Sequence, residues 1–249
     1  MKNKVFAVGD VHGQYTMFKE LLEYWNEEEE QLVLLGDLGD RGENPKACFE
    51  LARHLVEEKG AVCLMGNHEV MLANFLEQPN QAAASYEMNG GMVTVQSFLS
   101  RPEGSDDAAE LAEQIKSQFP WLMPFLTSRP LTFEWEDYLF VHAGVDLTLE
   151  NWKDTTDHNF VWIREGFYDQ PNHTGKIIVF GHTITPMLHG KQVNTDIWES
   201  EDGLIGLDGG AVYGGTLHGV VFGHKGIERQ YKVDSGGNLI SRLFGRNKK

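Results

Sequence analysis

Cysteine is scarce in this sequence, with two residues, Cys48 and Cys63, among 249. Cys48 falls in a helical pattern of apolar residues and Cys63 in an apolar strand pattern, so both are interpreted as small core residues. Neither has a second soft ligand at the spacing of a metal site. The scarcity therefore argues against a disulfide framework, a thiolate metal site and a cysteine nucleophile.

A long apolar run is also lacking. No stretch approaches the roughly eighteen residues that a membrane-spanning helix needs. The first eight residues turn from basic to apolar as a signal peptide does, but the apolar stretch is short and runs straight into Asp10 without a small-residue cleavage site. We interpret it as a buried strand, and we expect a cytoplasmic protein with no membrane partner.

Basic residues are few as well. Against 21 lysines and arginines stand 37 aspartates and glutamates, which gives a formal net charge of -16. Such a field repels the phosphate backbone, so binding to a nucleic acid duplex is disfavoured. It has little bearing on a small site in which bound metal ions reverse the local charge.

The length and the apolar fraction of 41% fit one large globular domain, which we expect over residues 1–240. Residues 241–249 form a basic tail that we expect to be frayed. Residues 74–126 turn helical and polar, and they are interpreted as a helical insertion beside the site. The sequence makes no prediction of the oligomeric state.

The strand signals fall into two groups. Three strand-like segments, residues 4–8, 31–35 and 61–65, are each followed by Gly-Asp or Gly-Asn. After each of them the chain continues as a loop and then a helix, so the order strand, loop, helix occurs three times. Crossovers of this kind build a largely parallel sheet with its ligands at the carboxyl ends of the strands. The glycine-rich last third is strand-like too, and it predicts a second, mostly antiparallel sheet.

Four of the ten histidines share one setting, next to glycine or a glycine loop at the end of an apolar strand: His12, His68, His142 and His182. A single histidine is more often a packing or surface residue than a ligand, but the repetition beside three Asp or Asn loops favours a joint metal site. Two divalent ions about 3.5–4 Å apart need a bridging carboxylate and further oxygen or imidazole ligands.

Asp37 closes the second strand and is the natural bridging carboxylate between the two ions. Asp10 and His12 flank a single residue, so their side chains can point to the same side. The second ion can be completed from three other strand ends, at Asn67, His142 and His182. Oxygen and imidazole ligands without thiolate favour manganese, with iron or zinc as alternatives.

Five segments resemble motifs of the phosphoprotein phosphatase family, which belongs to the calcineurin-like metallophosphoesterases. Three are signature motifs and two resemble the later metal-histidine motifs: Gly9-Asp10-Val11-His12-Gly13, Gly36-Asp37-Leu38-Gly39-Asp40-Arg41-Gly42, Gly66-Asn67-His68-Glu69, His142-Ala143-Gly144 and Gly181-His182-Thr183. The resemblance implies an α/β fold with two mixed β-sheets packed as a sandwich and flanked by helices. It also implies that Asp10, His12 and Asp37 hold the first metal ion, and that Asp37, Asn67, His142 and His182 hold the second.

The remaining catalytic roles are expected as follows. His68 is placed to protonate the leaving alkoxide, and the family's motif implies that Asp40 orients it, although Asp40 can also be read as a loop cap. Arg41 and Arg164 are candidates for a phosphate clamp, because a planar guanidinium matches two phosphoryl oxygens. A surface salt bridge to Glu165 or Asp169 is the alternative for Arg164.

Three further features are left with two readings each. Tyr213 lies in a loop that resembles the one lining the family's site, and it is either a substrate contact, with Asn67 and the arginines, or a packed tyrosine. Asn89-Gly90-Gly91 resembles a motif of the bacterial branch and otherwise reads as a turn. Glu69 is expected to face inward or cap the following helix.

The sequence also departs from the family's pattern at two places. Gly39 stands where the family usually has a bulkier apolar residue, and Gly209 where threonine or a similar residue is common. Both differences affect the expected loop rigidity and substrate shape, and neither removes a ligand or an acid.

The expected reaction is attack on phosphorus by a hydroxide that bridges the two metal ions, without a phosphoenzyme. The substrate is either a phosphoserine or phosphothreonine protein, which we favour, or a diadenosine polyphosphate cut symmetrically; a regulatory module with little turnover is the third reading. A dinucleotide needs extra cations and a stacking platform, for which the candidates are Lys153, Lys176, Lys191, Arg129, Trp152 and Trp162.

Overall fold

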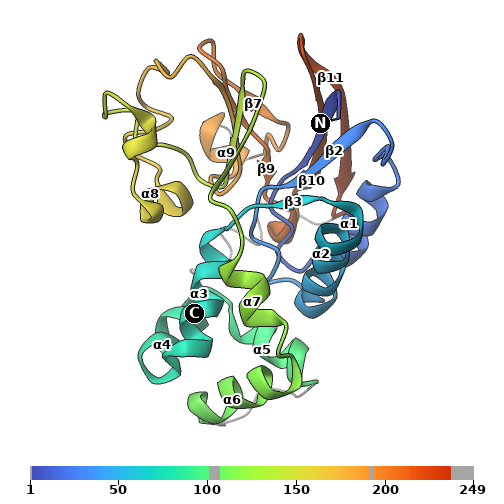
Figure 1. The fold of residues 1–249 in the computed structure, drawn as a ribbon, viewed down its shortest axis with the longest axis vertical. Coiled ribbons are helices and arrows are strands. Elements are labelled where there is room, and N and C mark those ends of the chain that lie inside the picture. The colour runs from blue at the N-terminus through green and yellow to red at the C-terminus, as the bar shows by residue number, and fades with distance from the viewer. Residues whose placement is uncertain (1, 101–106, 191–192, 237–249) are drawn as a thin grey trace.

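The computed structural model describes residues 2–100, 107–190 and 193–236. Two β-sheets form one part of the molecule and a group of helices forms another (Figure 1). The predicted tail at residues 241–249 and the candidate cation Lys191 lie outside the described residues.

The first sheet has the strand order β11-β10-β1-β2-β3, with β9 paired to β10. Its strands are β1 (Lys4–Val8), β2 (Glu30–Leu34), β3 (Val62–Cys63), β9 (Asp208–Gly209), β10 (Thr216–Gly223) and β11 (Gly226–Asp234). β1, β2 and β3 are parallel, as the repeated strand, loop and helix pattern predicts, whereas β10 runs antiparallel to β1 and β11.

The second sheet has the order β4-β5-β6-β8-β7. Its strands are β4 (Thr132–Trp135), β5 (Tyr138–Val141), β6 (Ile177–Phe180), β7 (Trp198–Glu199) and β8 (Leu204–Gly206). Its three central strands, β5, β6 and β8, are parallel, and only the outer pairs are antiparallel.

The prediction of a second, mostly antiparallel sheet built from the last third of the chain is therefore wrong. The β10–β11 hairpin joins the first sheet beside β1, and only β7 and β8 of that third enter the second sheet. Local sequence indicates that two strands form a hairpin, but the sheet they join depends on long-range pairing. All eight residues of β10 are buried, which fits a strand that lies inside a sheet.

Alternating side chains connect the two sheets. Val5 and Ala7 of β1 enter an apolar layer that also contains Phe140 of β5 and Val179 of β6. The intervening Phe6 faces the opposite core. Because the side-chain period of a strand is two, β1 buries both of its faces, one toward the second sheet and one toward the helices. The two mixed sheets with flanking helices confirm the predicted fold class.

Helices cover the outer faces of the sandwich. α1 (Tyr15–Leu22) and α2 (Pro45–Lys59) pack on the first sheet, and α8 (Asp157–Trp162) and α9 (Thr185–Leu188) accompany the second. Pro45 fits the first turn of α2, where its missing N–H is not needed. Two short 3₁₀ helices complete this part of the chain, η1 (Trp152–Asp154) and η2 (Ala211–Tyr213).

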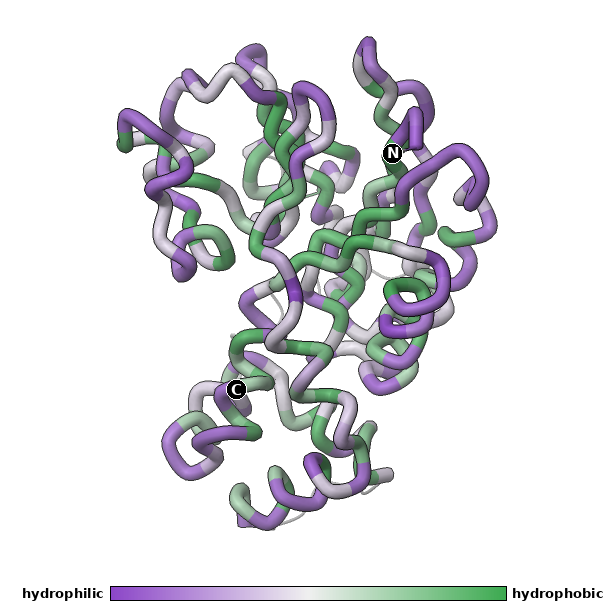
Figure 2. Tube along the Cα trace, in the orientation of Figure 1, coloured by the Kyte–Doolittle hydropathy of each residue, from purple (hydrophilic) through white to green (hydrophobic). Residues whose placement is uncertain are grey.

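The separate lobe in Figure 1 consists of consecutive helices. These are α3 (Asn67–Glu77), α4 (Pro79–Met88), α5 (Met92–Leu99), α6 (Ala108–Gln118) and α7 (Leu122–Thr127). Hydrophobic and hydrophilic residues alternate along the helices of the lobe (Figure 2). Their apolar faces join the same core as α1 and α2. The lobe is thereby fixed against the first sheet.

The two cysteines lie in the core of the protein. Cys48 and Cys63 are buried and free, in line with their interpretation as core residues. Burial raises the pKa of both thiols. Within the described residues, none of the helices has the length and apolarity needed to cross a membrane.

Candidate active site

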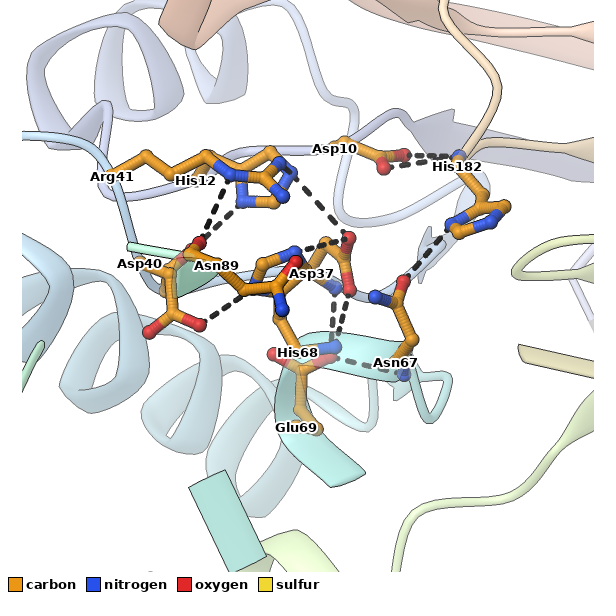
Figure 3. Close-up of polar contacts among 12 residues, drawn as sticks. Asp10, His12, Asp37, Asp40, Arg41, Asn67, His68, Glu69, Asn89 and His182 are labelled. Carbon is orange, nitrogen blue, oxygen red and sulfur yellow. Dashed lines mark hydrogen bonds and ion pairs between the residues drawn. The ribbon is translucent and has the colours of Figure 1, made fainter. Parts of the chain in front are cut away.

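The predicted site residues come together at the carboxyl ends of the central parallel strands. Asp10 and His12 follow β1, Asp37 follows β2, and Asn67 and His68 begin α3 just after β3. The second sheet contributes His142 after β5 and His182 after β6. Figure 3 shows that those of these side chains that it labels converge although they are far apart along the chain: Asp10, His12, Asp37, Asn67, His68 and His182.

The backbone is strained at this point. Five of the non-glycine residues in the left-handed region belong to the site: His12, Asp37, Asp40, Arg41 and His182, with φ between 43° and 65°. Each such conformation costs on the order of 1–3 kcal/mol, and it persists only where the surroundings enforce it. The His12 N–H donates to the Asp37 carbonyl at 2.8 Å, so two of the strained loops hold each other.

One cluster of possible ligand atoms forms around His12, Asp37 and His68, which offer atoms within 4.8 Å of one another. The His12 Nδ1–H donates to the Gly39 carbonyl at 2.9 Å. This leaves Nε2 facing Asp37 Oδ2 at 3.4 Å and accepting a hydrogen bond from Arg41 at 3.0 Å. His12 therefore presents a lone pair toward Asp37.

A second cluster forms around Asp37, His142 and His182. The His142 Nδ1–H donates to the Leu35 carbonyl at 2.9 Å, so its Nε2 faces Asn67 Oδ1 at 2.9 Å and Asp37 Oδ1 at 3.4 Å. His182 Nδ1 lies 2.9 Å from the same Asn67 oxygen. Asp37 thus turns one carboxylate oxygen to each cluster, as a bridging ligand would.

The chemistry of these atoms fits bound cations. Burial lowers the pKa of His12, His142 and His182, so the neutral imidazole is favoured. A neutral His142 that donates through Nδ1 has no proton on Nε2, and it therefore directs a lone pair at the Asn67 and Asp37 oxygens. Such a convergence of acceptors, all buried, is the donor set that a divalent metal requires.

Asp10 takes a different position from the other predicted ligands. It belongs to neither close cluster, and both of its carboxylate oxygens accept a hydrogen bond from the His182 backbone N–H, at 3.2 and 3.0 Å. Burial raises the pKa of Asp10, and the neighbouring carboxylates of Asp208 and Asp37 raise it further. The accumulated negative charge around Asp10 is the second indication that a cation belongs here.

Glu69 faces inward and ties two of the loops together. Its Oε2 accepts from the Asp37 and Gly66 N–H groups at 2.7 and 3.0 Å, and its Oε1 accepts from the Leu38 N–H at 2.9 Å. Burial raises the pKa of Glu69 to about 8, against the lowering effect of these donors. Since both oxygens already accept N–H groups, a proton on the carboxyl would have no acceptor, and the hydrogen bonds suit the ionised form.

His68 and Asp40 form a buried pair. The His68 Nδ1–H donates to Asp40 Oδ2 at 2.5 Å. Asp40 is therefore not simply a loop cap. Its other oxygen accepts from the hydroxyls of Tyr86, at 2.8 Å, and Thr94, at 2.5 Å. Sequence reasoning missed Tyr86 and Thr94, although the adjacent Asn89-Gly90-Gly91 motif pointed to this segment.

A pocket of about 290 Å³ opens over the clusters. Arg41, Arg164 and Tyr213 line it, and the Arg41 guanidinium lies 5.6 Å from the centre of the Tyr213 ring. Arg164 is exposed, and among the described residues it has no ion pair with Glu165 or Asp169. The guanidinium is thus available to the pocket.

The candidate cations for a polyphosphate lie elsewhere. Lys153 and Lys176 both form ion pairs with Glu134, and Arg129 stacks over Phe125. None of the three lines the pocket, and neither does Trp152, whereas Trp162 does. Within the described residues the pocket therefore offers two side chains of the lysine and arginine type, both of them arginines.

Asp208 is a site residue that sequence reasoning overlooked. It is buried, lines the pocket and begins β9, with one residue between it and the end of β8, close to the strand-end setting of the other predicted ligands. Burial raises its pKa to about 6. The strand-like pattern at residues 204–207 followed by Asp-Gly-Gly was the signal that could have identified it.

The two departures from the family's pattern have steric reasons. A Cβ on Gly39 would lie 2.5 Å from the Phe49 ring, and a Cβ on Gly209 would lie 2.4 Å from the Thr216 carbonyl oxygen. Larger residues do not fit at either place without movement of the packed neighbours.

Comparison with known proteins gives one family over most of the chain. The sequence model of the calcineurin-like phosphoesterases matches residues 4–228. A symmetrical bis(5'-nucleosyl)-tetraphosphatase from Glaesserella parasuis is 34% identical over 144 residues, which are 56% of this chain and 44% of that protein. The match therefore spans less than half of that relative.

Two other relatives are covered almost completely. Serine/threonine-protein phosphatase 1 of Salmonella typhimurium is 26% identical over 86% of this chain and 89% of its own length. An asymmetrical bis(5'-nucleosyl)-tetraphosphatase from Oceanobacillus iheyensis is 27% identical over 89% and 90%. The crystal structure of a putative diadenosine tetraphosphatase has the same fold, with a TM-score of 0.66, 19% identity and 94% coverage of both chains.

Proposed function

Because the chain belongs to the calcineurin-like phosphoesterase family, whose members are hydrolases, we propose that it is a two-metal phosphomonoesterase for phosphoserine and phosphothreonine in proteins. The observation that carries this proposal is the pair of buried ligand clusters that share Asp37 beneath a pocket lined by two arginines.

The proposed ligands are those that the sequence predicts. Asp10, His12 and Asp37 would hold one divalent ion, and Asp37, Asn67, His142 and His182 the other, with manganese as the proposed metal. The ions would supply a water of lowered pKa as the nucleophile and would neutralise charge on the phosphoryl group. The Asp10 carboxylate that would bind the first ion is already held by the His182 backbone N–H.

The protein's own groups would act on the phosphate and on the leaving oxygen. Arg41 and Arg164 line the same pocket, and their guanidinium groups would hold the phosphoryl oxygens. His68 donates its Nδ1–H to Asp40, which directs Nε2 toward the pocket. In the reaction a bond would form from the water oxygen to phosphorus as the water releases a proton to solvent, the ester P–O bond would break, and the His68 Nε2 proton would pass to the departing alkoxide. A proton from solvent then restores His68. The products are a free hydroxyl and inorganic phosphate.

The cation count supports a monoester over a dinucleotide. A tetraphosphate bridge presents four phosphates, and the described pocket supplies two arginines while Lys153, Lys176 and Arg129 are engaged elsewhere. A relative covered over 89% of its length is named a serine/threonine phosphatase.

Symmetrical hydrolysis of diadenosine tetraphosphate is the second candidate function. The observation in its favour is Trp162, which lines the pocket and offers a face on which a base can stack. The name of one relative points to symmetrical hydrolysis, and the name of another, an asymmetrical bis(5'-nucleosyl)-tetraphosphatase, points to the same class of substrate.

A direct assay separates these candidates. Purified protein with manganese is offered a phosphothreonine peptide and diadenosine tetraphosphate in parallel, and phosphate and nucleotides are quantified. Faster release of phosphate from the peptide supports the proposal, whereas faster formation of ADP from the dinucleotide overturns it in favour of the second candidate. Release from neither substrate would favour a regulatory module.

We propose the cytoplasm as the compartment, since the described thiols are free.

A further inference from the structure

The link between α4 and α5 is packed directly against the predicted phosphate clamp. The Arg41 backbone N–H donates to the Gly90 carbonyl at 3.1 Å, and Arg41 Nε donates to the Asn89 carbonyl at 3.2 Å. A Cβ on Gly90, whose φ is +83°, would lie 2.8 Å from Arg41 Cγ. The Asn89-Gly90-Gly91 segment is therefore more than a turn, because it fixes both the backbone and the side chain of Arg41.

The helices on either side of this link reach the neighbouring residue, Asp40. Tyr86 of α4 donates its hydroxyl to Asp40 Oδ1 at 2.8 Å, and Thr94 of α5 donates to the same oxygen at 2.5 Å. The Thr94 hydroxyl oxygen also accepts from the Asp40 backbone N–H at 2.8 Å. Tyr86 and Thr94 are 1% and 0% exposed, so water does not replace either hydroxyl.

These contacts determine which oxygen of Asp40 is available to His68. Two hydroxyls occupy Oδ1, and Oδ2 is left to accept the His68 Nδ1–H at 2.5 Å. Asp40 itself has φ +65°, a conformation that nothing in its own side chain enforces. Without the two hydroxyls, a buried carboxylate oxygen would lose its donors and the carboxyl group would be free to rotate.

We propose that Tyr86 and Thr94 are positioning residues, through which helices α4 and α5 set the orientation of the Asp40–His68 pair. This inference rests on the proposed function, in which His68 is the general acid. It assigns to helices α4 and α5 a role in catalysis that none of the five sequence motifs indicates.

The chain offers closely matched variants. Thr94→Val removes the hydroxyl at nearly constant volume, and Thr94→Ser keeps it. Tyr86→Phe removes the other donor. Tyr138→Phe is the control, because Tyr138 is also a buried tyrosine whose hydroxyl donates to a carbonyl, that of Gly223 at 3.1 Å, far from the pocket.

The kinetic test compares two leaving groups with manganese present. p-Nitrophenolate leaves without needing a proton, whereas the alkoxide of a phosphothreonine peptide needs one. We expect the Tyr86→Phe/Thr94→Val double variant to lose about tenfold or more of kcat on the peptide and less than about threefold on p-nitrophenyl phosphate, since general acids contribute about 10²–10⁴-fold. Thr94→Ser and Tyr138→Phe should keep the wild-type ratio. Equal losses of the double variant on the two substrates would overturn the positioning role, provided that His68→Ala itself slows the peptide more than p-nitrophenyl phosphate.

A second readout does not depend on turnover. The proton between His68 Nδ1 and Asp40 Oδ2 is expected to give a far-downfield ¹H NMR signal, assigned by its loss in His68→Ala. The double variant should shift or lose this signal, and Tyr138→Phe should keep it. An unchanged signal overturns the inference whatever the activity. If the signal responds but His68→Ala slows both substrates equally, the positioning stands and the general-acid role in the proposed function fails.

Discussion

Replacing Glu69 by glutamine tests whether the Glu69 carboxylate holds the loops of the proposed metal ligands in place. Glu69 is fully buried and accepts three backbone N–H groups, from Asp37, Leu38 and Gly66. Glutamine has the same shape, but its amide can accept through one oxygen only. In Glu69→Gln the NH₂ group must face at least one of these N–H donors.

The size of the effect follows from the number of donors at each oxygen. If the amide nitrogen takes the position of Oε1, one buried N–H loses its acceptor, and if it takes the position of Oε2, two do. Each unsatisfied group costs about 1–3 kcal/mol. The smaller loss is favoured, so we expect a destabilisation of about 1–3 kcal/mol. The N–H that loses its acceptor in this case is that of Leu38, which belongs to the loop of Asp37. We therefore also expect manganese affinity to fall by about 10–100-fold, as it does when groups that orient metal ligands are replaced.

Urea unfolding and manganese titration measure the two effects separately. Glu30→Gln is the matched control, since Glu30 is also fully buried and satisfies Asn26 and Arg229 at the opposite end of β2. It should lose stability while keeping the manganese affinity of the wild type. If Glu69→Gln likewise loses stability but binds manganese normally, Glu69 contributes to folding alone and the reasoning is refuted.

Four further outcomes are expected. His68→Ala should lower kcat on an alkyl phosphate by about 10²–10⁴-fold with unchanged metal content, and full activity on that substrate would exclude His68 as the acid. Arg164→Ala should lower kcat/KM by about 10–100-fold, since a charge-assisted hydrogen bond contributes about 1.5–3 kcal/mol, and steady-state kinetics showing no loss would remove it from the clamp. Chelation should abolish turnover and lower the melting temperature, with both restored by manganese; activity that survives exhaustive chelation would contradict a metal mechanism. Cys48 and Cys63 should resist a thiol reagent such as DTNB in the native protein and react in denaturant, because burial raises their pKa; rapid native reaction would show that the core opens.

The predictable parts of the site are those that a short stretch of the sequence determines by itself. A proposed ligand such as Asp37 follows an apolar strand and a glycine, so its place at the carboxyl end of a parallel strand can be predicted from a short window. The parallel order of β1, β2 and β3 follows from the same repeated pattern. The fold class was predictable for this reason, and the resemblance to the family supplied the second sheet.

The parts that were missed depend on contacts between distant segments. The β10–β11 hairpin pairs with β1 across more than two hundred residues, and no local feature of either segment specifies that neighbour. Tyr86 and Thr94 look like ordinary positions in amphipathic helices until α4 and α5 are placed against Asp40. Hydrogen bonds of this range are invisible to periodicity, since periodicity reports only which face of an element is buried.

The strained backbone gives a reason why residues that never touch the substrate matter so much here. His12, Asp37, Asp40, Arg41 and His182 all have positive φ, at a combined cost of several kcal/mol if each costs about 1–3 kcal/mol. Their own side chains are turned toward the clusters or the pocket and cannot stabilise these conformations locally. The hydrogen bonds that stabilise these conformations come from other segments. Glu69 binds the Asp37 loop, whereas Thr94 of α5 and the link between α4 and α5 bind the backbone of Asp40 and Arg41.

In the proposed reaction the metal ligands, the acid and the clamp supply the chemistry, while groups that never touch the substrate hold them in place. Substitutions in those groups should therefore change catalysis without changing any ligand, acid or clamp residue. The helical lobe is the clearest case, because it holds Asp40 and Arg41 at once. A movement of α4 against α5 would displace both Asp40, which orients the proposed general acid, and Arg41 of the proposed phosphate clamp. Protonation of the leaving group and binding of the phosphate would therefore change together.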